Sequence, residues 1–408
     1  MLCSPAWLRR MHARARKNIS ACPMPTWSAL DTYDDGRPCA RHYRSVTTST
    51  ETDIAAGEWS INDRVLQLRE WGTDNIHLLP QPPEVGLANL SIGSAEVCSL
   101  QIHDPSGQVS RLHASLDHHS GGLLLHDLGS KNGIRLNGAR CSRTELVAGD
   151  EFGIGGLTLI AESRCSIALR GFLARLLGWR SERIAVVDHA LRSIRMAATR
   201  RAALVLCGPD DLVPIASAIH RRAFGADRPF IVCDPRRRRS QATVRSPENY
   251  DTGMSAFAAA TGGSLCMRSL RLPKDFRTVI AAFRAQSAKV RLVICAQTAE
   301  PCEEQRALPL VLPRLDTRDD EIDRIIAEYA EDAITALGTS RTGFLPADHD
   351  WVRMHSASSL PDIEKGTLRL VAIRASRNLS DAAARLDMAP VSLSRWIGRR
   401  KLPMRIEP

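Results

Sequence analysis

Between residues 90 and 160 the chain alternates short apolar segments with Gly and Asn turns, and this pattern constrains the fold more than any other feature. Short strands of period two, with turns every ~8–12 residues, are typical of an all-β sandwich. The pattern therefore predicts a sandwich here rather than a helical domain. The apolar segments are residues 100–102, 123–128, 134–136, 152–154 and 157–160.

Four short motifs occur in one order along these segments. They are Ile92-Gly93, Ser110-Arg111-Leu112-His113, Gly129-Ser130-Lys131-Asn132-Gly133 and Asn137-Gly138. Together they resemble the forkhead-associated (FHA) domain, a β-sandwich whose loops bind phosphothreonine. The resemblance covers residues 62–162.

The resemblance implies a phosphopeptide site on these loops. A phosphothreonine carries nearly two negative charges and three acceptor oxygens, so its reader needs hydroxyl, amide and guanidinium groups. By resemblance, Ser110 and Arg111 contact the phosphate, His113 braces the loop from inside, and Asn132 holds the peptide backbone. The expected phosphopeptide contacts are Ser94, Ser110, Arg111, Ser130, Lys131 and Asn132, and the expected structural positions are Gly93, His113, Gly133, Asn137 and Gly138.

One position departs from the family pattern. The family usually has Arg after the first Gly, whereas this chain has Ser94. A charged hydrogen bond contributes ~1.5–3 kcal/mol, so its loss weakens binding by roughly 10- to 100-fold. Two interpretations remain open: a phosphate-dependent reader that uses Arg111 and Lys131, or a sandwich that binds protein surfaces without phosphate.

Length, net charge and cysteine content limit what the rest of the chain can be. The 408 residues have room for about two to four domains. The net charge of +10 favours acidic partners, with nucleic acid first. Eleven cysteines without a C-x-x-C pair suit a reducing cytoplasm and argue against a disulfide framework or a zinc site. The histidines also lack metal-ligand spacing, and His118-His119 is expected in an exposed turn. No apolar run reaches the ~18–20 residues that span a bilayer.

Residues 1–61 are expected to form a disordered, basic and Thr-rich tail. The alternatives are a transit peptide or an overextended start with Met24 as the initiator. The segment 47–53 contains Thr50, with Asp53 three residues downstream. This arrangement is similar to small FHA regulators that bind their own phosphorylated tail. The expected partner is therefore a phosphothreonine protein or this tail, unless the segment is an unmodified linker.

A helical connector is predicted over 163–200, and the pattern then changes to apolar strands that alternate with helices over 201–315. Such alternation predicts a parallel sheet covered on both faces. Strands are expected at 203–208, 229–233, 263–267 and 290–295, and helices at 212–222, 254–260 and 275–286.

The short sequence motifs of this region are similar to those of the AAA+ domain of bacterial enhancer-binding activators, a P-loop-type α/β domain. The family's loop G-E-S-G-T-G-K-E is replaced by Gly208-Pro209-Asp210-Asp211, before a helix that ends Ala218-Ile219-His220. The lysine that reaches the terminal phosphates is therefore missing. Asp210 and Asp211 put negative charge where an anion would sit at a helix N-terminus.

The second nucleotide motif also departs from the family. In G-G-T-L-F-L-D-E the last two positions bind Mg²⁺ and activate water, and they are Arg268 and Ser269 here. The family's G-A-F-T-G-A loop has no counterpart around residues 250–253. The region contains no acid–base pair and no nucleophile that would indicate a different enzyme on the same sheet. The prediction is a degenerate, ATPase-dead scaffold with no catalytic residue, cofactor or metal.

Two further features follow in this region. The run of four arginines at 236–239 is interpreted either as a solvated loop or as an auxiliary contact to DNA phosphates or to another subunit. An amphipathic helix is expected over 318–337, opened by the acids 319–321 that suit a helix N-terminus. It matches the start of the family's helical lid, which is expected over 316–360.

The last segment, 361–408, predicts a helical pair. Ser380 is expected to cap the first helix, Asp387 lies in the turn, and a second helix runs from Pro390 to Arg399. This resembles the Fis-type helix-turn-helix, in which Gly usually occupies the position of Asp387. The expected buried residues are Ala383, Leu386, Met388, Leu393 and Trp396. The implied DNA contacts are Val391, Ser392, Ser394, Arg395, Arg399, Arg400 and Lys401, with Arg405 as a further phosphate contact.

These features together predict a multidomain, cytoplasmic bacterial transcription regulator without a membrane segment. It would couple phosphothreonine-peptide binding to sequence-specific binding of duplex DNA through an inactive AAA+-like scaffold. Homodimers are expected because Fis-type hairpins dimerise in that family. The alternative is a phospho-dependent signalling scaffold whose C-terminal hairpin only dimerises.

Overall fold

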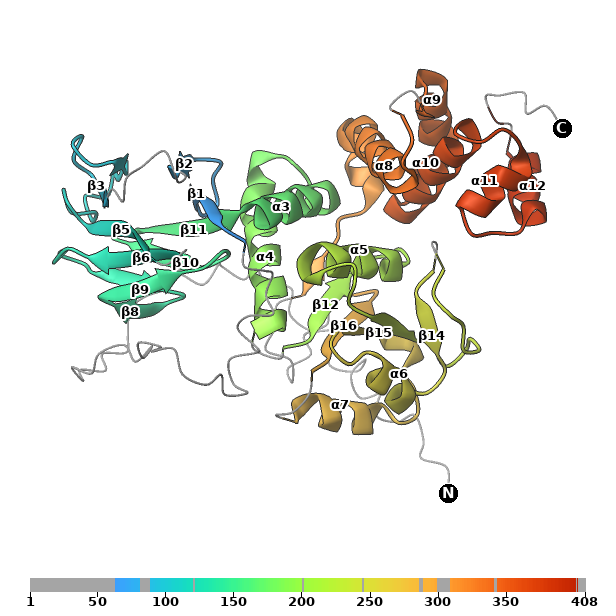
Figure 1. The fold of residues 1–408 in the computed structure, drawn as a ribbon, viewed down its shortest axis with the longest axis horizontal. Coiled ribbons are helices and arrows are strands. Elements are labelled where there is room, and N and C mark those ends of the chain that lie inside the picture. The colour runs from blue at the N-terminus through green and yellow to red at the C-terminus, as the bar shows by residue number, and fades with distance from the viewer. Residues whose placement is uncertain are drawn as a thin grey trace, which may run out of the picture. The chain divides into compact units, whose positions relative to one another are not determined.

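The computed structural model describes residues 63–80, 89–119, 122–199, 202–243, 246–285, 289–298, 309–340, 343–400 and 402. The described residues belong to one compact unit. The predicted tail at 1–61, with Met24 and the threonine segment, lies outside them, and so do Lys401 and Arg405. The described elements are a β-sandwich, two connecting helices, an α/β region and a C-terminal group of helices (Figure 1).

The predicted all-β sandwich is confirmed. One sheet has the strand order β2-β1-β11-β10-β7-β8, and the other has the order β4-β3-β5-β6-β9. The strands are β1 (Val65–Glu70), β2 (Ile76–Leu78), β3 (Leu90–Gly93), β4 (Leu100–Gln101), β5 (Ala114–His119), β6 (Gly122–Asp127), β7 (Ile134–Leu136), β8 (Ala139–Cys141), β9 (Arg143–Leu146), β10 (Glu151–Ile154) and β11 (Leu157–Ser163).

Alternating side chains from both sheets form the core of the sandwich. Leu68, Ile92, Leu116, Leu125 and Phe152 are fully buried there. Each such side chain contributes about 1.5–3 kcal/mol relative to an exposed position. The core therefore explains why the period-two pattern identified this fold.

A two-residue turn joins β7 to β8 and fixes their register. Asn137 and Gly138 both have positive φ, at 49° and 90°. This is the combination that a type I′ hairpin requires, and Asn-Gly is its preferred sequence. Leu136 consequently pairs with Ala139.

The expected helical connector is confirmed and consists of two helices. α3 (Arg164–Leu177) begins at the cap Ser163 and ends at Gly178, whose φ of 116° does not continue a helix. α4 (Ile184–Thr199) follows a short 3₁₀ turn, η2 (Ser181–Arg183).

The α/β region contains the predicted parallel sheet, with the order β14-β13-β15-β16-β12-β17. Helix α5 covers one face, and α6 and α7 cover the other (Figure 1). The edge strands β14 and β17 have only three and two residues and were not expected. The elements are β12 (Leu204–Cys207), α5 (Leu212–Phe224), β13 (Phe230–Cys233), β14 (Glu248–Tyr250), α6 (Gly253–Ala259), β15 (Ser264–Arg268), η3 (Ser269–Arg271), α7 (Phe276–Arg284), β16 (Arg291–Ala296) and β17 (Leu310–Val311).

The C-terminal part is helical, as expected. Ala383, Leu386 and Leu393 are fully buried where the last two helices cross, and Trp396 is buried beside them. Asp387 adopts the left-handed conformation that the family's Gly would supply, with φ at 48°. The elements are η4 (Leu315–Thr317), η5 (Asp319–Glu321), α8 (Ile322–Leu337), α9 (Pro346–His355), α10 (Leu360–Arg374), α11 (Leu379–Arg385) and α12 (Pro390–Gly398).

Three local predictions were wrong. Asn378, not Ser380, caps α11, because its side chain accepts a hydrogen bond of 2.9 Å from the backbone N–H of Asp381. The acids 319–321 form a 3₁₀ turn, and α8 begins only at residue 322. His118 and His119 lie in β5, paired with Leu123 and Gly122, instead of in an exposed turn.

Candidate functional site

Three of the predicted motifs are held together by hydrogen bonds at the loops that follow β3, β4 and β6. The backbone N–H of Ser94 donates to the carbonyl of Ser110 at 3.1 Å. The hydroxyl of Ser110 accepts from the backbone N–H of Lys131 at 3.1 Å. The Asn132 side chain donates to the carbonyl of Gln108 at 2.8 Å. The predicted phosphopeptide residues therefore come from separate parts of the sequence to one group of loops.

His113 links two of these loops from inside. The side chain is fully buried. Its Nδ1 accepts from the backbone N–H of Ser110 at 3.1 Å, so the ring proton lies on Nε2, which donates to the carbonyl of Gly133 at 3.2 Å. Replacing the imidazole would leave a backbone donor and a backbone acceptor without these partners.

Gly93 permits the closest approach between the loops. A Cβ atom at this position would lie 2.1 Å from the carbonyl oxygen of Arg111, which no side chain tolerates. The same carbonyl accepts hydrogen bonds from the backbone N–H of Ala95 and from the thiol of Cys98, both at 3.1 Å. The backbone of Arg111 is thus fixed while its side chain is exposed.

The hydroxyl groups in these loops are not equally available to a ligand. Ser110 accepts a hydrogen bond, and its own proton is left to donate. Ser130 donates to Asp127 at 2.6 Å and accepts from the N–H of Gly133, so its proton is already used. Ser94 donates to the carbonyl of Val109 at 3.2 Å. In this structure the hydroxyl protons of Ser94 and Ser130 are donated within the loops, and the phosphate contacts expected of the two residues stay a prediction.

The cationic groups of the site lie at its surface. The side chains of Arg111, Lys131 and Asn132 are exposed. With the Ser110 hydroxyl, they provide a guanidinium, an ammonium and an amide on loops whose backbone is already hydrogen-bonded. These donors suit the oxygen atoms of a phosphate group that is attached to a peptide.

A further basic pair was missed by sequence reasoning. Arg135 and Arg140 are directly opposite each other on β7 and β8, and both are exposed. The Arg140 guanidinium lies beside the predicted loop, because a Cβ at Gly133 would be 2.9 Å from its Nε. Like charges directly opposite on a ladder are destabilising, so an anion beside them would stabilise the pair. The Asn-Gly turn, which sets this register, was the signal that could have found it.

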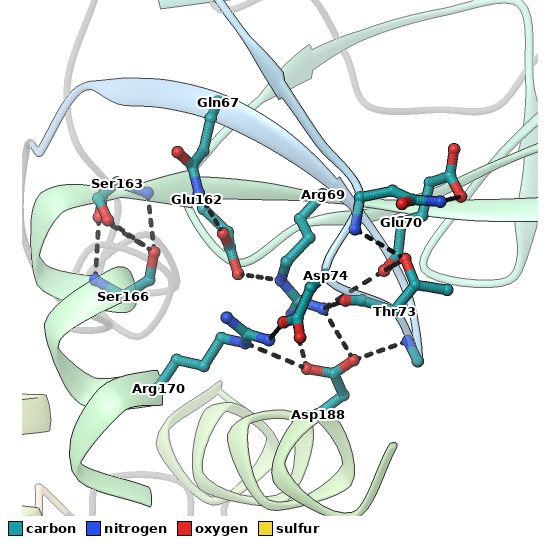
Figure 2. A network of polar contacts seen from close by, with 12 residues as sticks. Gln67, Arg69, Glu70, Thr73, Asp74, Glu162, Ser163, Ser166, Arg170 and Asp188 are labelled. Atoms are coloured by element: carbon teal, nitrogen blue, oxygen red, sulfur yellow. Dashed lines mark hydrogen bonds and ion pairs between the residues drawn. The ribbon is translucent and has the colours of Figure 1, made fainter. Parts of the chain in front are cut away.

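The sandwich is joined to helix α4 by a buried ion network, which Figure 2 shows. Arg69 is fully buried between Glu162 and Asp188, at 2.8 and 2.6 Å. Asp188 also accepts from the backbone N–H of Gly72 at 2.8 Å. Burial disfavours the charged form of Arg69, but its hydrogen bonds and the two carboxylates raise its pKa above the ordinary value.

A second attachment lies at the β7–β8 turn. The Asn137 side chain donates to Asp150 at 2.9 Å and accepts from the backbone N–H of Glu151 at 3.1 Å. Arg195 of α4 donates to the same Asn137 oxygen at 3.0 Å and pairs with Asp150. The turn residue expected to be structural therefore also contacts the connecting helix.

Ion pairs cross the carboxyl edge of the parallel sheet, where open α/β sheets usually bind ligands. Asp211 caps α5 and contacts Arg268 at 2.8 Å. Arg268 also reaches the buried Asp234 at 3.3 Å, and Arg271 reaches it at 3.0 Å. Burial raises the pKa of Asp234, but the Arg236 backbone N–H and the two arginines outweigh this and lower it.

The expected DNA-contacting residues on α12 are mostly at its surface. Val391, Ser392, Ser394, Arg395 and Arg399 are exposed, and Arg400 is half-buried. The guanidinium groups of Arg400 and Arg369 lie 5.3 and 5.0 Å from the ring centre of Trp396. Arg369 comes from α10 and was not predicted. A groove here is lined by Arg369, Met388, Ser392, Arg395, Trp396, Arg399 and Arg400.

The described residues contain neither a metal-binding cluster nor a membrane-spanning helix. Among them, no three or more His, Cys, Asp or Glu side chains are grouped so that they could hold a metal ion. None of the helices in the described ranges combines the length and apolar character needed to cross a bilayer.

Comparison with known proteins identifies one region. Residues 90–155 match the FHA domain family model. No curated protein matches the chain. Among solved structures, the chain is similar to the N-terminal FHA domain of S. cerevisiae Rad53p in complex with a phosphothreonine peptide, with 23% identity over 25% of this chain and 94% of that chain and a TM-score of 0.22.

Two further solved structures are similar over about a quarter of the chain. The FHA domain of a Chlamydia trachomatis protein has 22% identity over 23% of this chain and 92% of that chain, with a TM-score of 0.20. Mycobacterium tuberculosis EmbR in complex with a low affinity phosphopeptide has 21% identity over 28% of each chain, with a TM-score of 0.23. The family match assigns an FHA domain to the loops described above.

Proposed function

We propose that this protein is a transcription regulator in which an FHA domain binds a phosphothreonine peptide and helices α11 and α12 bind duplex DNA. FHA domains take part in phosphothreonine-dependent protein interactions. The observation that carries the proposal is the donor set of Ser110, Arg111 and Lys131 on loops that hydrogen bonds join to one another.

The DNA-binding part of the proposal is supported by the surface of α12. Its exposed polar side chains lie on one short helix that begins at Pro390, and arginines follow at its end. A helix of this kind in the major groove places its first turns at base edges and its end near phosphates. Arg369 adds a cation from a different helix beside Trp396.

The expected contributions of these residues differ in kind. Replacing Arg395 with Ala should cost ~1–3 kcal/mol on the preferred site only, because a base contact is lost. Replacing Arg399 and Arg400 with Ala should weaken binding to all duplexes alike and flatten the salt dependence. Binding of the full chain to sequences selected from a random duplex library, measured at several salt concentrations, checks both.

An absence of sequence-specific DNA binding would favour the alternative, a scaffold whose C-terminal hairpin only dimerises. If the full chain selects no sequence, and the variants at 395, 399 and 400 bind duplexes as the unaltered chain does, α11 and α12 do not read DNA. A loss of self-association in the same variants would then support a phospho-dependent scaffold whose hairpin dimerises.

The α/β region is proposed to act as a scaffold without ATPase activity. The lysine and the acidic pair of the resembled AAA+ family are absent, and Arg268 instead bridges Asp211 and Asp234. These contacts use the charges at the sheet edge within the protein itself. Negative charge at the start of α5 also opposes a phosphate there.

Nucleotide is therefore expected to leave the protein unchanged. A ligand that binds the native state must raise its stability by mass action, by about 2.7 kcal/mol at a concentration 100-fold above Kd. Millimolar Mg-ATP should give no shift of the melting temperature and no release of phosphate. A clear upward shift of the melting temperature of the unaltered chain at millimolar Mg-ATP would overturn the scaffold assignment.

A further inference from the structure

A run of four consecutive arginines follows strand β13 and is exposed along its whole length. Residues 236–239 lie between β13 and the edge strand β14, whose position Figure 1 shows. Like charges in sequence repel, and a mobile loop would relieve that repulsion by spreading. The geometry of this loop shows how its backbone is held.

The buried side chain of Asn249 holds the backbone of the run. Its amide nitrogen lies 3.3 Å from the carbonyl oxygens of Arg237 and Arg238, and its oxygen accepts from the N–H of Asp234 at 3.1 Å. The backbones of Ser240 and Asn249 also exchange two hydrogen bonds of 3.0 Å. Both ends of the arginine run are therefore tied to β14 by a residue that is 5% exposed.

The charge of the run is only weakly compensated. Asp234, the acid before it, forms its shortest ion pairs with Arg268 and Arg271, and it lies 3.7 Å from the Arg237 guanidinium. Arg239 lies over the Tyr250 ring at 4.6 Å and donates to its hydroxyl at 3.1 Å, which orients its guanidinium. Within the described part of the chain, Arg236 and Arg238 make no ion pair.

A fixed loop with several uncompensated guanidinium groups concentrates positive potential at one place. Guanidinium groups bind phosphate with two hydrogen bonds and stay charged at every physiological pH. The neighbouring exposed positions at 240–243 carry no large apolar side chain. Protein interfaces usually have an apolar centre, whereas contacts to nucleic-acid backbones are dominated by cations.

We propose that residues 236–239 form a binding site for the phosphate backbone of duplex DNA. The contact is independent of base sequence and of α12, so it goes beyond the proposed reading of DNA by the C-terminal helices. Arg236 and Arg238 supply the free cations, Arg239 is oriented by Tyr250, and Asn249 is the positioning residue that keeps the loop in place.

The test compares two double variants of the full chain that lose the same charge. The first replaces Arg236 and Arg238 with Gln. The control replaces Arg277 and Arg284 with Gln, which are exposed on α7. Binding to a duplex of arbitrary sequence is measured as a function of salt. We expect the first variant to bind roughly 10-fold more weakly, with a salt slope about 1.8 shallower, because two phosphate contacts are lost at ~0.9 each. The control should keep the unaltered slope.

A third variant separates position from charge. Asn249→Ala keeps every arginine, and we expect it to weaken duplex binding several-fold while the melting temperature confirms a folded chain. Equal slopes for the two double variants would overturn the proposal. Reduced binding of the loop variant to polyglutamate or to anionic vesicles, with an unchanged duplex slope, would overturn it in favour of an acidic protein or a membrane surface.

The phosphate site at 236–239 and the reading of DNA by α12 can fail independently of each other. If the chain selects no DNA sequence, but the loop variant still loses its salt slope, the site at 236–239 stands and the reading by α12 fails. If the chain selects a DNA sequence and the loop variant behaves as the control does, the reading of DNA by α12 stands and the site at 236–239 fails.

Discussion

Replacing Arg69 with Ala is expected to lower the free energy of unfolding by about 3–5 kcal/mol. The change leaves Glu162 and Asp188, which are almost completely buried, without the cation that lies between them. Two carboxylates in a site of low polarity must then be protonated or hydrated, and either costs free energy. Urea unfolding of the full chain at neutral pH measures the effect.

A matched control uses the same acid. Arg170 lies 4.0 Å from Asp188 but is partly exposed, and its closer partner Asp74 is at the surface. Arg170→Ala should therefore cost no more than about 1 kcal/mol. Replacing Arg69 with Met together with Asp188→Leu and Glu162→Gln should recover much of the lost stability, because no buried charge remains. Equal losses for Arg69→Ala and Arg170→Ala would contradict the buried network.

Replacing Arg111 with Ala is expected to weaken phosphothreonine-peptide binding by roughly 10- to 100-fold, the equivalent of a charged hydrogen bond of ~1.5–3 kcal/mol. The converse change, Ser94→Arg, should strengthen binding by a similar factor, because it adds the cation that the FHA family usually has there. Calorimetric titration of the full chain with a phosphothreonine peptide library measures both. Arg277→Ala, on α7 of the α/β region, serves as the control for lost charge.

The same titration distinguishes the possible ligands. A phosphorylated 44–56 peptide tests recognition of the protein's own tail, where tethering would make the local concentration roughly millimolar and offset weak affinity. Equal affinity for phosphorylated and plain 44–56 peptides would exclude self-recognition. If no peptide of the library depends on phosphate, the sandwich binds protein surfaces by another route.

Sequence patterns predicted the sandwich and the parallel sheet because their signals are local. Period-two segments and an Asn-Gly turn are readable within a few residues, and so are fully apolar strands between helices. The strands β14 and β17 were missed because two or three residues carry no period. The pairing of β17 depends on β12, which is distant in sequence, and the pairing of β14 depends on β13 across the loop that contains residues 236–239.

Sequence motifs identified the loops of the candidate site but not the hydrogen bonds within them. Ser110 and Ser130 are the same residue type in similar loops, yet only Ser130 has an acid, Asp127, within reach of its proton. Likewise, Arg268 was recognised as a replaced acid, but its bridge between Asp211 and Asp234 depends on three strand ends that meet only in the sheet.

The buried contact between β1 and α4 also decides where this chain can be cut. Residues 90–155 carry the family match, and β11 ends at Ser163. A fragment that ends there separates Asp188 from Arg69 and removes Arg195 from the β7–β8 turn. We therefore expect the smallest fragment that keeps the sandwich stable to extend through α4 to residue 199, some 36 residues past the last strand of the sandwich.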